Sequence, residues 1–512
     1  MKELWARFPE YLSAHLELSL GALAIAALVA VPLGVWLGRR PRTAPALLAL
    51  VGALQTIPSL ALLAFMVPAL AALGVLTSRL FGFEVRAIGT GPALAALTLY
   101  GVLPILQNTV AGIRGVDPAC REAARGVGMT PRQQLWRVEI PLALPVMVAG
   151  LRTAAVWVVG TATLSTPVGA ASLGNYIFSG LQTRNYSAVS LGCVAAAGLA
   201  FVLDRAIGLL ERGVRDRRRA LALVVAGLLL ALGVAALANA RSAPPPRAVA
   251  IGSKTFTEQY ILSELLADWI ERGAGLPARQ LQSLGSTVLF DALRSGEVDV
   301  YVDYSGTLWA NVLKRDGAPG GRSQVLEEVR HALAAEYGVT LAAALGFENT
   351  YALAMRADRA RALGIETLSD LARHAPELEI GADYEFLARP EWQALVSAYG
   401  LAFRAARSMD PSLMYQAVAD GQVDVISAFS TDGRIAALGL TALTDDRGVI
   451  PPYDAVVLVG RRLARERPDV VALLGGLEGR IDAATMQRLN RAVDQQGRAP
   501  AAVAREWLDA AR

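Results

Sequence analysis

The sequence predicts a chain of two unlike parts, an all-α membrane domain of about six transmembrane helices followed by an α/β domain of two lobes. Its 512 residues exceed what one ordinary hydrophobic core organises. Hydrophobic residues make up 54% of the chain and charged residues only 18%, which suits a protein that lies half in a membrane and half in water. The hydrophobic residues gather in long runs in the first half, whereas charged residues recur every few positions in the second.

Six segments of the first half are long and apolar enough to cross a membrane, which takes roughly 20 residues. They are Leu18–Leu37, Ala46–Leu73, Pro92–Val110, Leu142–Leu164, Ala188–Leu210 and Ala220–Ala240. The second segment contains Pro58 and Pro68. We therefore expect it to be broken or partly re-entrant, which is tolerated where neighbouring helices satisfy the freed carbonyl groups.

Arginines predict the orientation of these segments. Three clusters occupy alternate loops: Arg39, Arg40 and Arg42; Arg114, Arg121, Arg125, Arg132 and Arg137; and Arg212, Arg215, Arg217, Arg218 and Arg219. The positive-inside rule places all three clusters in the cytoplasm, so the chain is expected to begin and end outside it. We expect a multi-pass protein of the cytoplasmic membrane whose second half is extracytoplasmic. The net charge of +4 is small for this length and does not indicate nucleic-acid binding.

One cytoplasmic loop carries a recognisable pattern. It contains Glu122-Ala123-Ala124, then Gly128, then Val138-Glu-Ile-Pro141. This loop resembles the EAA loop of ABC importer permeases, with Val138 and Ile140 as volume-conserving departures. We expect two short helices bent at Gly126/Gly128, with Pro131 beginning the second. The resemblance implies a type I importer permease in which Glu122, Ala123, Ala124, Gly128 and Pro141 contribute to docking on an ATPase. An ordinary amphipathic loop is the alternative.

The ATP-hydrolysing machinery itself is expected on another chain. No G-x-x-x-x-G-K-[ST] pattern occurs, so the phosphate-binding loop of an ATPase is missing from this sequence. ABC importers place two permease domains around one pathway, and this chain carries one. The resemblance therefore implies a homodimer through the permease domain together with two copies of a separate ATPase subunit.

The expected domain boundaries follow from these patterns. Residues 1–219 form the permease domain with the EAA loop at 122–141, 220–240 an additional membrane helix, and 241–247 a linker stiffened by three prolines. Residues 248–512 alternate short apolar strands with helices. We expect strands at Val249–Ile251, Val298–Val302, Tyr351–Met355, Val423–Ser427 and Ala455–Val459, and a helix at Glu258–Glu271.

Five segments of the second half resemble, in order, the binding proteins of the glycine betaine, carnitine and choline family. They are Ile251-Gly-Ser-Lys-Thr-Phe-Thr-Glu-Gln-Tyr260, Gly296-Glu-Val-Asp-Val-Tyr-Val-Asp-Tyr-Ser-Gly-Thr307, Asn349-Thr-Tyr-Ala-Leu-Ala354, Ala428-Phe-Ser-Thr-Asp-Gly-Arg-Ile435, and Asp445-Asp446 leading to Pro451-Pro-Tyr453. The resemblance implies a type II periplasmic-binding-protein fold. Lobe one then comprises about 248–348 and 454–512, and lobe two about 349–453.

The resemblance also implies a binding site for a small quaternary-ammonium solute. A trimethylammonium group offers no N–H, so it is selected by aromatic faces, here Tyr304, Tyr351, Phe429 and Tyr453. Phe429 departs from the tyrosine that the family often has. The carboxylate of a betaine needs donors, for which we expect Lys254, Arg389 and Thr307. Thr255-x-x-Glu258 has the spacing of a capping box, which would place Lys254 at a helix N-terminus.

Each site residue also has a structural interpretation. A single tyrosine is more often part of a core, and Lys254 or Arg389 could be a solvated surface charge. His15, His331 and His374 lie near no nucleophile or ligand set, and Cys120 and Cys193 match no metal spacing. We therefore expect no catalysis, metal or cofactor in this chain. An ergothioneine importer of the same architecture is the alternative function, and a membrane-bound ligand sensor without transport is the alternative from another class.

Overall fold

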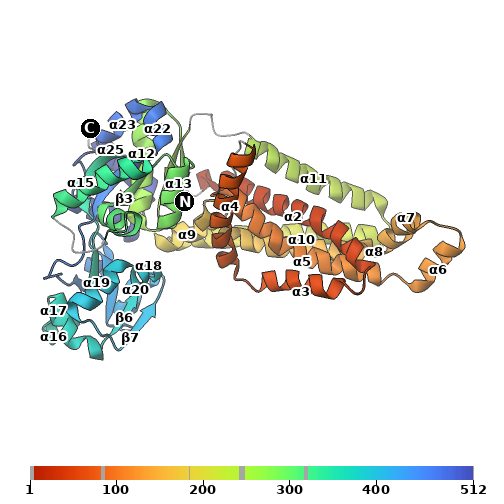
Figure 1. The fold of residues 1–512 in the computed structure, drawn as a ribbon, viewed down its shortest axis with the longest axis horizontal. Coiled ribbons are helices and arrows are strands. Elements are labelled where there is room, and N and C mark those ends of the chain that lie inside the picture. Colours follow the sequence, from red (N-terminus) through yellow and green to blue (C-terminus); the bar gives the residue numbers. More distant parts are fainter. Residues whose placement is uncertain (1–4, 82–86, 184, 242–247, 316–320, 511–512) are drawn as a thin grey trace. The chain divides into compact units, whose positions relative to one another are not determined.

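The computed structural model describes residues 5–81, 87–183, 185–241, 248–315 and 321–510. The chain divides into two compact units (Figure 1). The first comprises residues 1–178 and 187–243, and the second residues 179–186 and 244–512. Most of the linker expected at 241–247 lies outside the described residues.

The first unit is entirely helical in its described part. Its long helices are α2 (Phe8–Gly38), α3 (Ala44–Gln55), α4 (Ser59–Phe81), α5 (Thr90–Arg114), α8 (Ile140–Ala162), α10 (Tyr186–Arg215) and α11 (Arg219–Arg241). Its shorter elements are α6 (Pro118–Gly126), α7 (Pro131–Gln134), the π-helical turn η1 (Leu135–Glu139) and the 3₁₀ turn η2 (Thr163–Val168). Helix α9 (Gly174–Gln182) passes from the first unit into the second.

The membrane segments expected from the sequence are recovered with one break. Among the described residues, four stretches of helix are long and apolar enough to span a membrane: Phe8–Gly38, Thr90–Arg114, Pro131–Val168 and Tyr186–Arg215. The second expected span is a pair, Ala44–Gln55 and Ser59–Gly74, bent by 96° where Pro58 intervenes, which confirms the expected break. The last expected span corresponds to α11, whose described apolar part, Ala220–Ala235, is shorter.

Helices α2, α5 and α8 pack most closely because small residues let their backbones approach. A Cβ atom on Gly34 of α2 would lie 2.6 Å from Cβ of Thr109 on α5. A Cβ atom on Gly150 of α8 would lie 2.5 Å from Cβ of Asn108, the neighbouring residue of α5. In lipid, where burial of apolar surface between helices brings no gain, such close packing is what holds a bundle together.

The second unit alternates strands and helices. Its strands are β1 (Val249–Gly252), β2 (Ala278–Leu281), β3 (Val300–Tyr304), β4 (Thr340–Glu348), β5 (Tyr351–Arg356), β6 (Glu379–Ala382), β7 (Ala405–Ser408), β8 (Val425–Phe429), β9 (Leu440–Ala442) and β10 (Asp454–Val459). The expected strands at 249, 298, 351, 423 and 455 and the expected helix at 258 are thereby confirmed, each within two or three residues at its ends.

In the described part of this unit, fourteen helices and three irregular turns connect and cover these strands. The longer helices are α12 (Thr257–Ala274), α13 (Ser286–Ser295), α15 (Arg322–Ala332), α19 (Pro390–Tyr399), α20 (Pro411–Ala419), α23 (Pro468–Gly475), α24 (Ala483–Asp494) and α25 (Pro500–Ala510). The shorter ones are α14 (Ser305–Thr307), α16 (Ala357–Leu363), α17 (Leu368–His374), α18 (Tyr384–Ala388), α21 (Arg434–Ala437) and α22 (Arg461–Glu466); the turns are η3 (Leu308–Val312), η4 (Leu333–Tyr337) and η5 (Ala375–Glu377).

The strands form two five-stranded sheets, one in each lobe. The order in lobe one is β2-β1-β3-β10-β4, and in lobe two it is β7-β6-β8-β5-β9. The chain crosses from lobe one to lobe two between β4 and β5 and returns between β9 and β10, where it enters the first sheet antiparallel to β3. Two lobes joined by two crossovers are the fold expected from the sequence.

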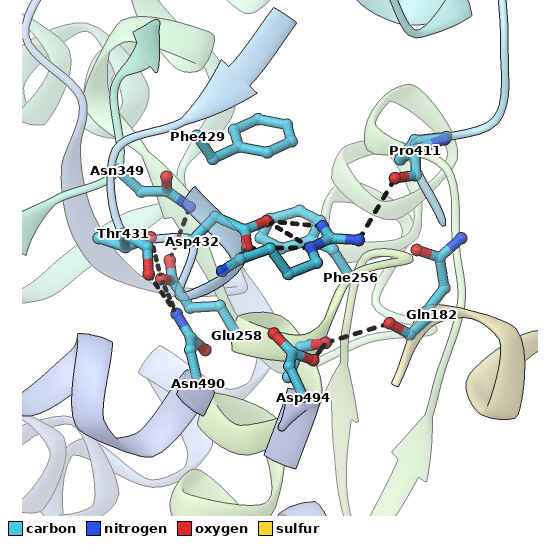
Figure 2. Close-up of a pocket in the computed structure, with 12 residues that line it drawn as sticks. Gln182, Phe256, Glu258, Asn349, Pro411, Phe429, Thr431, Asp432, Asn490 and Asp494 are labelled. Atoms are coloured by element: carbon cyan, nitrogen blue, oxygen red, sulfur yellow. Dashed lines mark hydrogen bonds and ion pairs between the residues drawn. The ribbon is translucent and has the colours of Figure 1, made fainter. Parts of the chain in front are cut away.

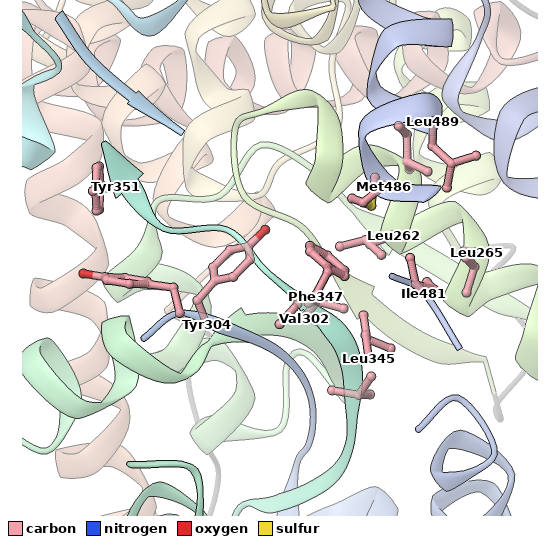
Figure 3. Close-up of a cluster of buried hydrophobic side chains, with 14 of the residues drawn as sticks. Leu262, Leu265, Val302, Tyr304, Leu345, Phe347, Tyr351, Ile481, Met486 and Leu489 are labelled. Atoms are coloured by element: carbon pink, nitrogen blue, oxygen red, sulfur yellow. The ribbon is translucent and has the colours of Figure 1, made fainter. Parts of the chain in front are cut away.

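A hydrophobic core runs through both lobes, and part of it is shown in Figure 3. At one end Leu262, Met486 and Ile481 pack between α12, α24 and the first sheet. At the other end Tyr304 and Tyr351 continue the same cluster toward the crossovers. The aromatic residues proposed for ligand binding are thus attached directly to the core that rigidifies the lobes.

Candidate functional site: the junction of the lobes and the cytoplasmic loop

The residues expected to bind a ligand lie where strands end and the chain crosses between lobes. Lys254 follows β1, Tyr304 ends β3 and Thr307 closes the adjoining turn α14. From the crossovers and lobe two come the others: Tyr351 begins β5, Arg389 separates α18 from α19, Phe429 ends β8 and Tyr453 precedes β10. Six of the seven are buried, and Phe429 is partly buried.

Tyr351 is the centre of an aromatic cluster. Its ring centroid lies 5.0 Å from that of Phe429 and 5.7 Å from that of Tyr453, the latter pair meeting edge to face. Two further rings, which the sequence did not single out, belong to the same cluster. Phe386 lies 4.9 Å from Tyr351, and Phe256 lies 5.6 Å from Phe429 in a near-parallel stack.

Tyr304 joins this cluster through Phe256, whose ring centroid is 6.1 Å away. The close fit of Tyr453 depends on Gly306 beside Thr307, because a Cβ atom there would lie 2.7 Å from the tyrosine ring. Burial raises the pKa of the hydroxyl groups of Tyr304, Tyr351 and Tyr453 well above 10, so all three are neutral phenols at physiological pH. The cluster therefore presents π faces rather than phenolate charges.

Lys254 is buried and already paired. Its Nζ lies 2.5 Å from Oδ1 of Asp303 and 5.4 Å from the ring centroid of Tyr304. The same carboxylate accepts hydrogen bonds from the hydroxyl of Tyr301 and the backbone N–H of Tyr304. Lys254 is thus not a solvated surface charge. Its positive charge is balanced within the protein before any ligand is considered.

The capping box expected at Thr255-x-x-Glu258 is wrong. Helix α12 begins at Thr257, its N-cap is Phe256, and that residue makes no side-chain capping bond. Glu258 instead lies in the first turn and turns its carboxylate inward, where Tyr304 and three other residues donate to it. Tertiary hydrogen bonds have taken the side chain that the local pattern assigned to a cap.

Arg389 is 5% exposed and lies over the aromatic cluster, its guanidinium carbon 5.2 Å from the ring centroid of Tyr351. Its Nη2 donates to Glu385, and its Nη1 lies 3.6 Å from Oε1 of Glu391. Glu391 also accepts a hydrogen bond from the hydroxyl of Tyr453. The Nε and Nη1 groups of Arg389 have no hydrogen-bond partner in the protein, which leaves buried donors beside the aromatic rings.

A small pocket adjoins the cluster on the side of Phe429 and Phe256 (Figure 2). Its polar lining includes Glu258, Asn349, Thr431 and Asn490, as well as an ion pair between Asp432 and Arg434. Phe429 is the one residue of the expected site that lines it. Thr431, Asp432 and Arg434 belong to the fourth family segment, which is the signal that could have found these three.

The cytoplasmic loop of the first unit has the conformation expected from its sequence. Helix α6 ends at Gly126, Gly128 has a backbone φ of +80°, and Pro131 begins α7 behind a capping box between Thr130 and Gln133. Glu122 and Ala123 are exposed, as is Pro141, whereas Ala124 is buried. Val127 and Trp136 are 73% and 63% exposed. An apolar surface of this kind suits docking of another protein.

The base of this loop is fixed by a buried carboxylate. Glu139 is 4% exposed, and its Oε2 accepts hydrogen bonds from Nε and Nη2 of Arg39 at 3.0 and 2.9 Å. Arg121 of α6 lies 3.8 Å from the other oxygen. The ion pairs join the end of α2, α6 and the turn before α8.

In the described part of the chain, no group of three or more histidine, cysteine, aspartate or glutamate residues could hold a metal ion. Cys120 and Cys193 are both free thiols.

Comparison with known proteins places both units in transport families. Residues 247–510 match the family described as the substrate binding domain of ABC-type glycine betaine transport systems. Residues 30–216 match the family described as the inner membrane component of binding-protein-dependent transport systems. The chain belongs to the ABC importer family in which permease and substrate-binding domain are one polypeptide. The ergothioneine transport permease/ergothioneine binding protein of Helicobacter pylori is 31% identical over 94% of this chain and 86% of its own length.

Relatives that carry only one of the two domains are similar to the corresponding half. The choline transport system permease protein of Bacillus subtilis is 42% identical over 39% of this chain and 84% of its own length. The carnitine transport binding protein of Listeria monocytogenes is 32% identical over 51% of this chain and 85% of its own length. The fused importer subunit therefore has a multi-pass permease domain in the cytoplasmic membrane and an extracytoplasmic binding domain, and both matched families are transport families.

Proposed function

We propose that this importer subunit captures a betaine, a small zwitterion with a quaternary ammonium group, and passes it through its own permease domain. The observation that carries the proposal is Arg389. Its buried Nε and Nη1 donors make no hydrogen bond in the protein, although Nη1 lies 3.6 Å from Glu391, and the guanidinium lies over the ring of Tyr351. Aromatic faces attract a cation that has no N–H, and unpaired guanidinium donors attract a carboxylate at its other end.

Lys254 and Thr307 complete the proposed site from lobe one. Lys254 adds positive charge near Tyr304, but its Nζ already donates a hydrogen bond to Asp303. Since Nε and Nη1 of Arg389 make no hydrogen bond in the protein, we assign Lys254 a smaller part in anion binding than Arg389. Thr307 is buried beside Gly306 and contributes a hydroxyl to the same region. The proposed boundaries remain 1–219 for the permease, 220–240 for the additional helix, 241–247 for the linker and 248–512 for the binding domain.

Ergothioneine is the second candidate ligand. The relative similar over nearly the whole chain is named for ergothioneine, which is itself a betaine, whereas relatives similar to one half are named for choline or carnitine. Phe429 has no hydroxyl group where the family often has a tyrosine, so the site favours a ligand that needs no hydrogen bond at this position. The ring centroids of Phe429 and Phe256 lie 5.6 Å apart in a stack. Phe256 thus extends the apolar surface beyond the four aromatic residues expected from the sequence.

The assembly is proposed to be a homodimer of this chain with two copies of a separate ATPase subunit. ATP hydrolysis is assigned to that partner, which docks on the exposed surface of α6 and the loop after it. Native mass spectrometry in nanodiscs, with the ATPase co-expressed, should give two copies of each subunit. A transport-competent particle with one copy of this chain would refute the homodimer.

The ligand is tested on residues 248–512, which contain both sheets and their common core. A separate binding protein is similar to this part over 264 residues, which indicates that it folds on its own. Isothermal titration with glycine betaine, proline betaine, carnitine, choline and ergothioneine should give the tightest binding for a betaine. Absence of binding by every betaine at millimolar concentration would overturn the proposal.

A further inference from the structure

Glu258 is the most fully bonded carboxylate at the junction of the lobes. Its side chain extends from the first turn of α12 and is 2% exposed. Oε1 accepts hydrogen bonds from the hydroxyl of Tyr304 at 2.6 Å and Nδ2 of Asn349 at 2.9 Å. Oε2 accepts from Oγ1 of Thr431 at 2.6 Å and Nδ2 of Asn490 at 3.1 Å. Figure 2 shows the two asparagines reaching the carboxylate from opposite sides.

All four donors are neutral, and no ion pair joins Glu258 to a cation in the described part of the chain. Burial raises the pKa of Glu258, while the four hydrogen bonds act in the opposite direction. A carboxylate removed from water in this way is stabilised only if its neighbours replace the lost hydration completely. The four donors surround one buried acceptor, the carboxylate of Glu258. The stability of this buried charge depends on all four remaining in place.

The donors come from both lobes. Tyr304 and Asn490 belong to β3 and α24 of lobe one, and Asn349 lies in the crossover between β4 and β5. Thr431 follows β8 in lobe two. Two further bonds hold the same part of lobe two against the end of lobe one. Nδ2 of Asn490 donates to the carbonyl of Thr431 at 3.1 Å, and Nε2 of Gln495 donates to the carbonyl of Gly433 at 2.9 Å.

We propose that Glu258 is a latch between the lobes, a positioning residue that holds residues 430–433 of lobe two against lobe one and orients Tyr304 at the same time. The inference rests on the proposed function in so far as Tyr304 belongs to the ligand site. When the lobes separate, Thr431 leaves the carboxylate and water takes its place. When they close, Thr431 returns to the same atom that Asn490 binds, so closure and the orientation of Tyr304 are established together.

Polar atoms suit such a latch better than an apolar contact would. An apolar surface exposed on opening gains nothing from water, whereas a carboxylate and a threonine hydroxyl are hydrated well in the open form. The hydrogen bonds therefore give the closed form its geometry without preventing release. The affinity of a ligand held between lobes is governed largely by its dissociation rate, which the latch would control.

Glu258→Gln tests the proposal with little change of shape. One oxygen becomes an NH₂ group, and whichever way the carboxamide is turned, it faces at least one asparagine NH₂ and loses that bond. Glu271→Gln is the matched control, because Glu271 lies on the same helix, is exposed, and accepts one backbone hydrogen bond that glutamine can still accept. Thr431→Val removes the donor from lobe two alone.

The full chain in nanodiscs is compared with its variants by stopped-flow release of glycine betaine and by hydrogen exchange without ligand. Glu258→Gln and Thr431→Val are expected to speed release about tenfold and to raise amide exchange in residues 430–434, with exchange in β1 and β3 unchanged. The effects of the two changes should be less than additive in the double variant, because both act on the one hydrogen-bonded network around residue 258.

Three results would overturn the latch: exchange at 430–434 equal to that of Glu271→Gln, faster exchange throughout lobe one, or additive effects in the double variant. Wild-type chain that binds no betaine would refute the proposed function instead. In that case the exchange measurement, which needs no ligand, still decides the latch by the same criterion.

Discussion

Arg389 and Tyr351 lie against each other, the guanidinium carbon 5.2 Å from the centroid of the tyrosine ring. The pair places side by side the groups that would bind the two charged ends of the proposed ligand. The ring offers a face for a quaternary ammonium group, and the guanidinium offers Nε and Nη1 donors that make no hydrogen bond in the protein. A ligand that satisfies both must carry its cation and its carboxylate a few bonds apart, which describes a betaine better than choline.

Removing Arg389 is therefore expected to affect betaines selectively. Arg389→Ala should weaken glycine betaine binding about tenfold to a hundredfold, since charge-assisted hydrogen bonds contribute roughly 1.5–3 kcal/mol each. Choline, which has no carboxylate, should lose much less. Isothermal titration of both ligands against residues 248–512 measures the difference. Equal losses for the two ligands would mean that Arg389 does not meet a carboxylate.

Lys254→Ala should behave differently from Arg389→Ala. Its removal leaves Asp303 buried without its cation, which typically costs about 3–5 kcal/mol of folding free energy. The variant is expected to unfold at a lower denaturant concentration, with a smaller change in ligand selectivity than that of Arg389→Ala. Denaturant titration with matched ligand titration distinguishes the two. A variant of unchanged stability that no longer prefers betaine to choline would move the main anion contact to Lys254.

Tyr351 is expected to contribute to every ligand with a quaternary ammonium group. Tyr351→Leu removes the ring that Phe429, Tyr453 and Arg389 contact. Binding of glycine betaine and choline should therefore weaken alike, by about twofold to thirtyfold for a loss of roughly 0.5–2 kcal/mol. Tyr351→Phe is the matched control, because it keeps the face and removes only the hydroxyl. Titration of both variants that finds equal losses would show that the hydroxyl, rather than the face, binds.

Most of the fold could be predicted from local pattern, because apolar runs and strand-to-helix alternation are properties of neighbouring residues. The errors occurred where a terminus is decided elsewhere in the chain. The strand expected from Val298 begins at Val300, since the N–H groups of Glu297 and Val298 instead cap α13 by bonding to the carbonyl of Ala292. A pattern of alternating residues contains no information about that helix end.

The candidate site was predictable only in part, for the same reason. Glu258 fits a capping-box spacing, yet its actual partners lie 46 to 232 residues away along the chain. Phe256 was overlooked as part of that expected cap, although its ring connects Tyr304 to Phe429. A resemblance to known motifs identified residues one segment at a time. Which of them meet is decided by the crossing of two sheets, and that requires coordinates.

Gly128 tests the role of the cytoplasmic loop. Its φ of +80° is a conformation that other residues adopt only at a cost of roughly 1–2 kcal/mol, although a side chain there would meet no atom within 4 Å. Gly128→Val should distort the bend between α6 and α7 and reduce uptake in cells several-fold, while ligand binding to residues 248–512 is unaffected. Gly126→Ala is the matched control, because Gly126 has equal space and ends a helix without a positive φ. Equal uptake by the two variants, at equal expression, would show that coupling to the ATPase does not depend on this bend.

The tyrosines of the cluster give a prediction for alkaline pH. Burial raises the pKa of Tyr304, Tyr351 and Tyr453 well above 10 in the folded domain, whereas in the unfolded chain these phenols titrate near 10. The folded state therefore holds more protons than the unfolded state once the pH passes 10, so the free energy of unfolding should fall as the pH rises further. Below pH 10 the three phenols contribute no such slope.

Denaturant unfolding of residues 248–512 between pH 8 and 11.5 measures the effect, and Tyr351→Phe should make the alkaline slope shallower because one of the three groups is gone. Tyr337→Phe is a suitable control, since that hydroxyl belongs to a half-buried residue outside the cluster. If Tyr351→Phe left the slope as steep as Tyr337→Phe does, Tyr351 would not be the buried neutral phenol that the proposed aromatic box requires.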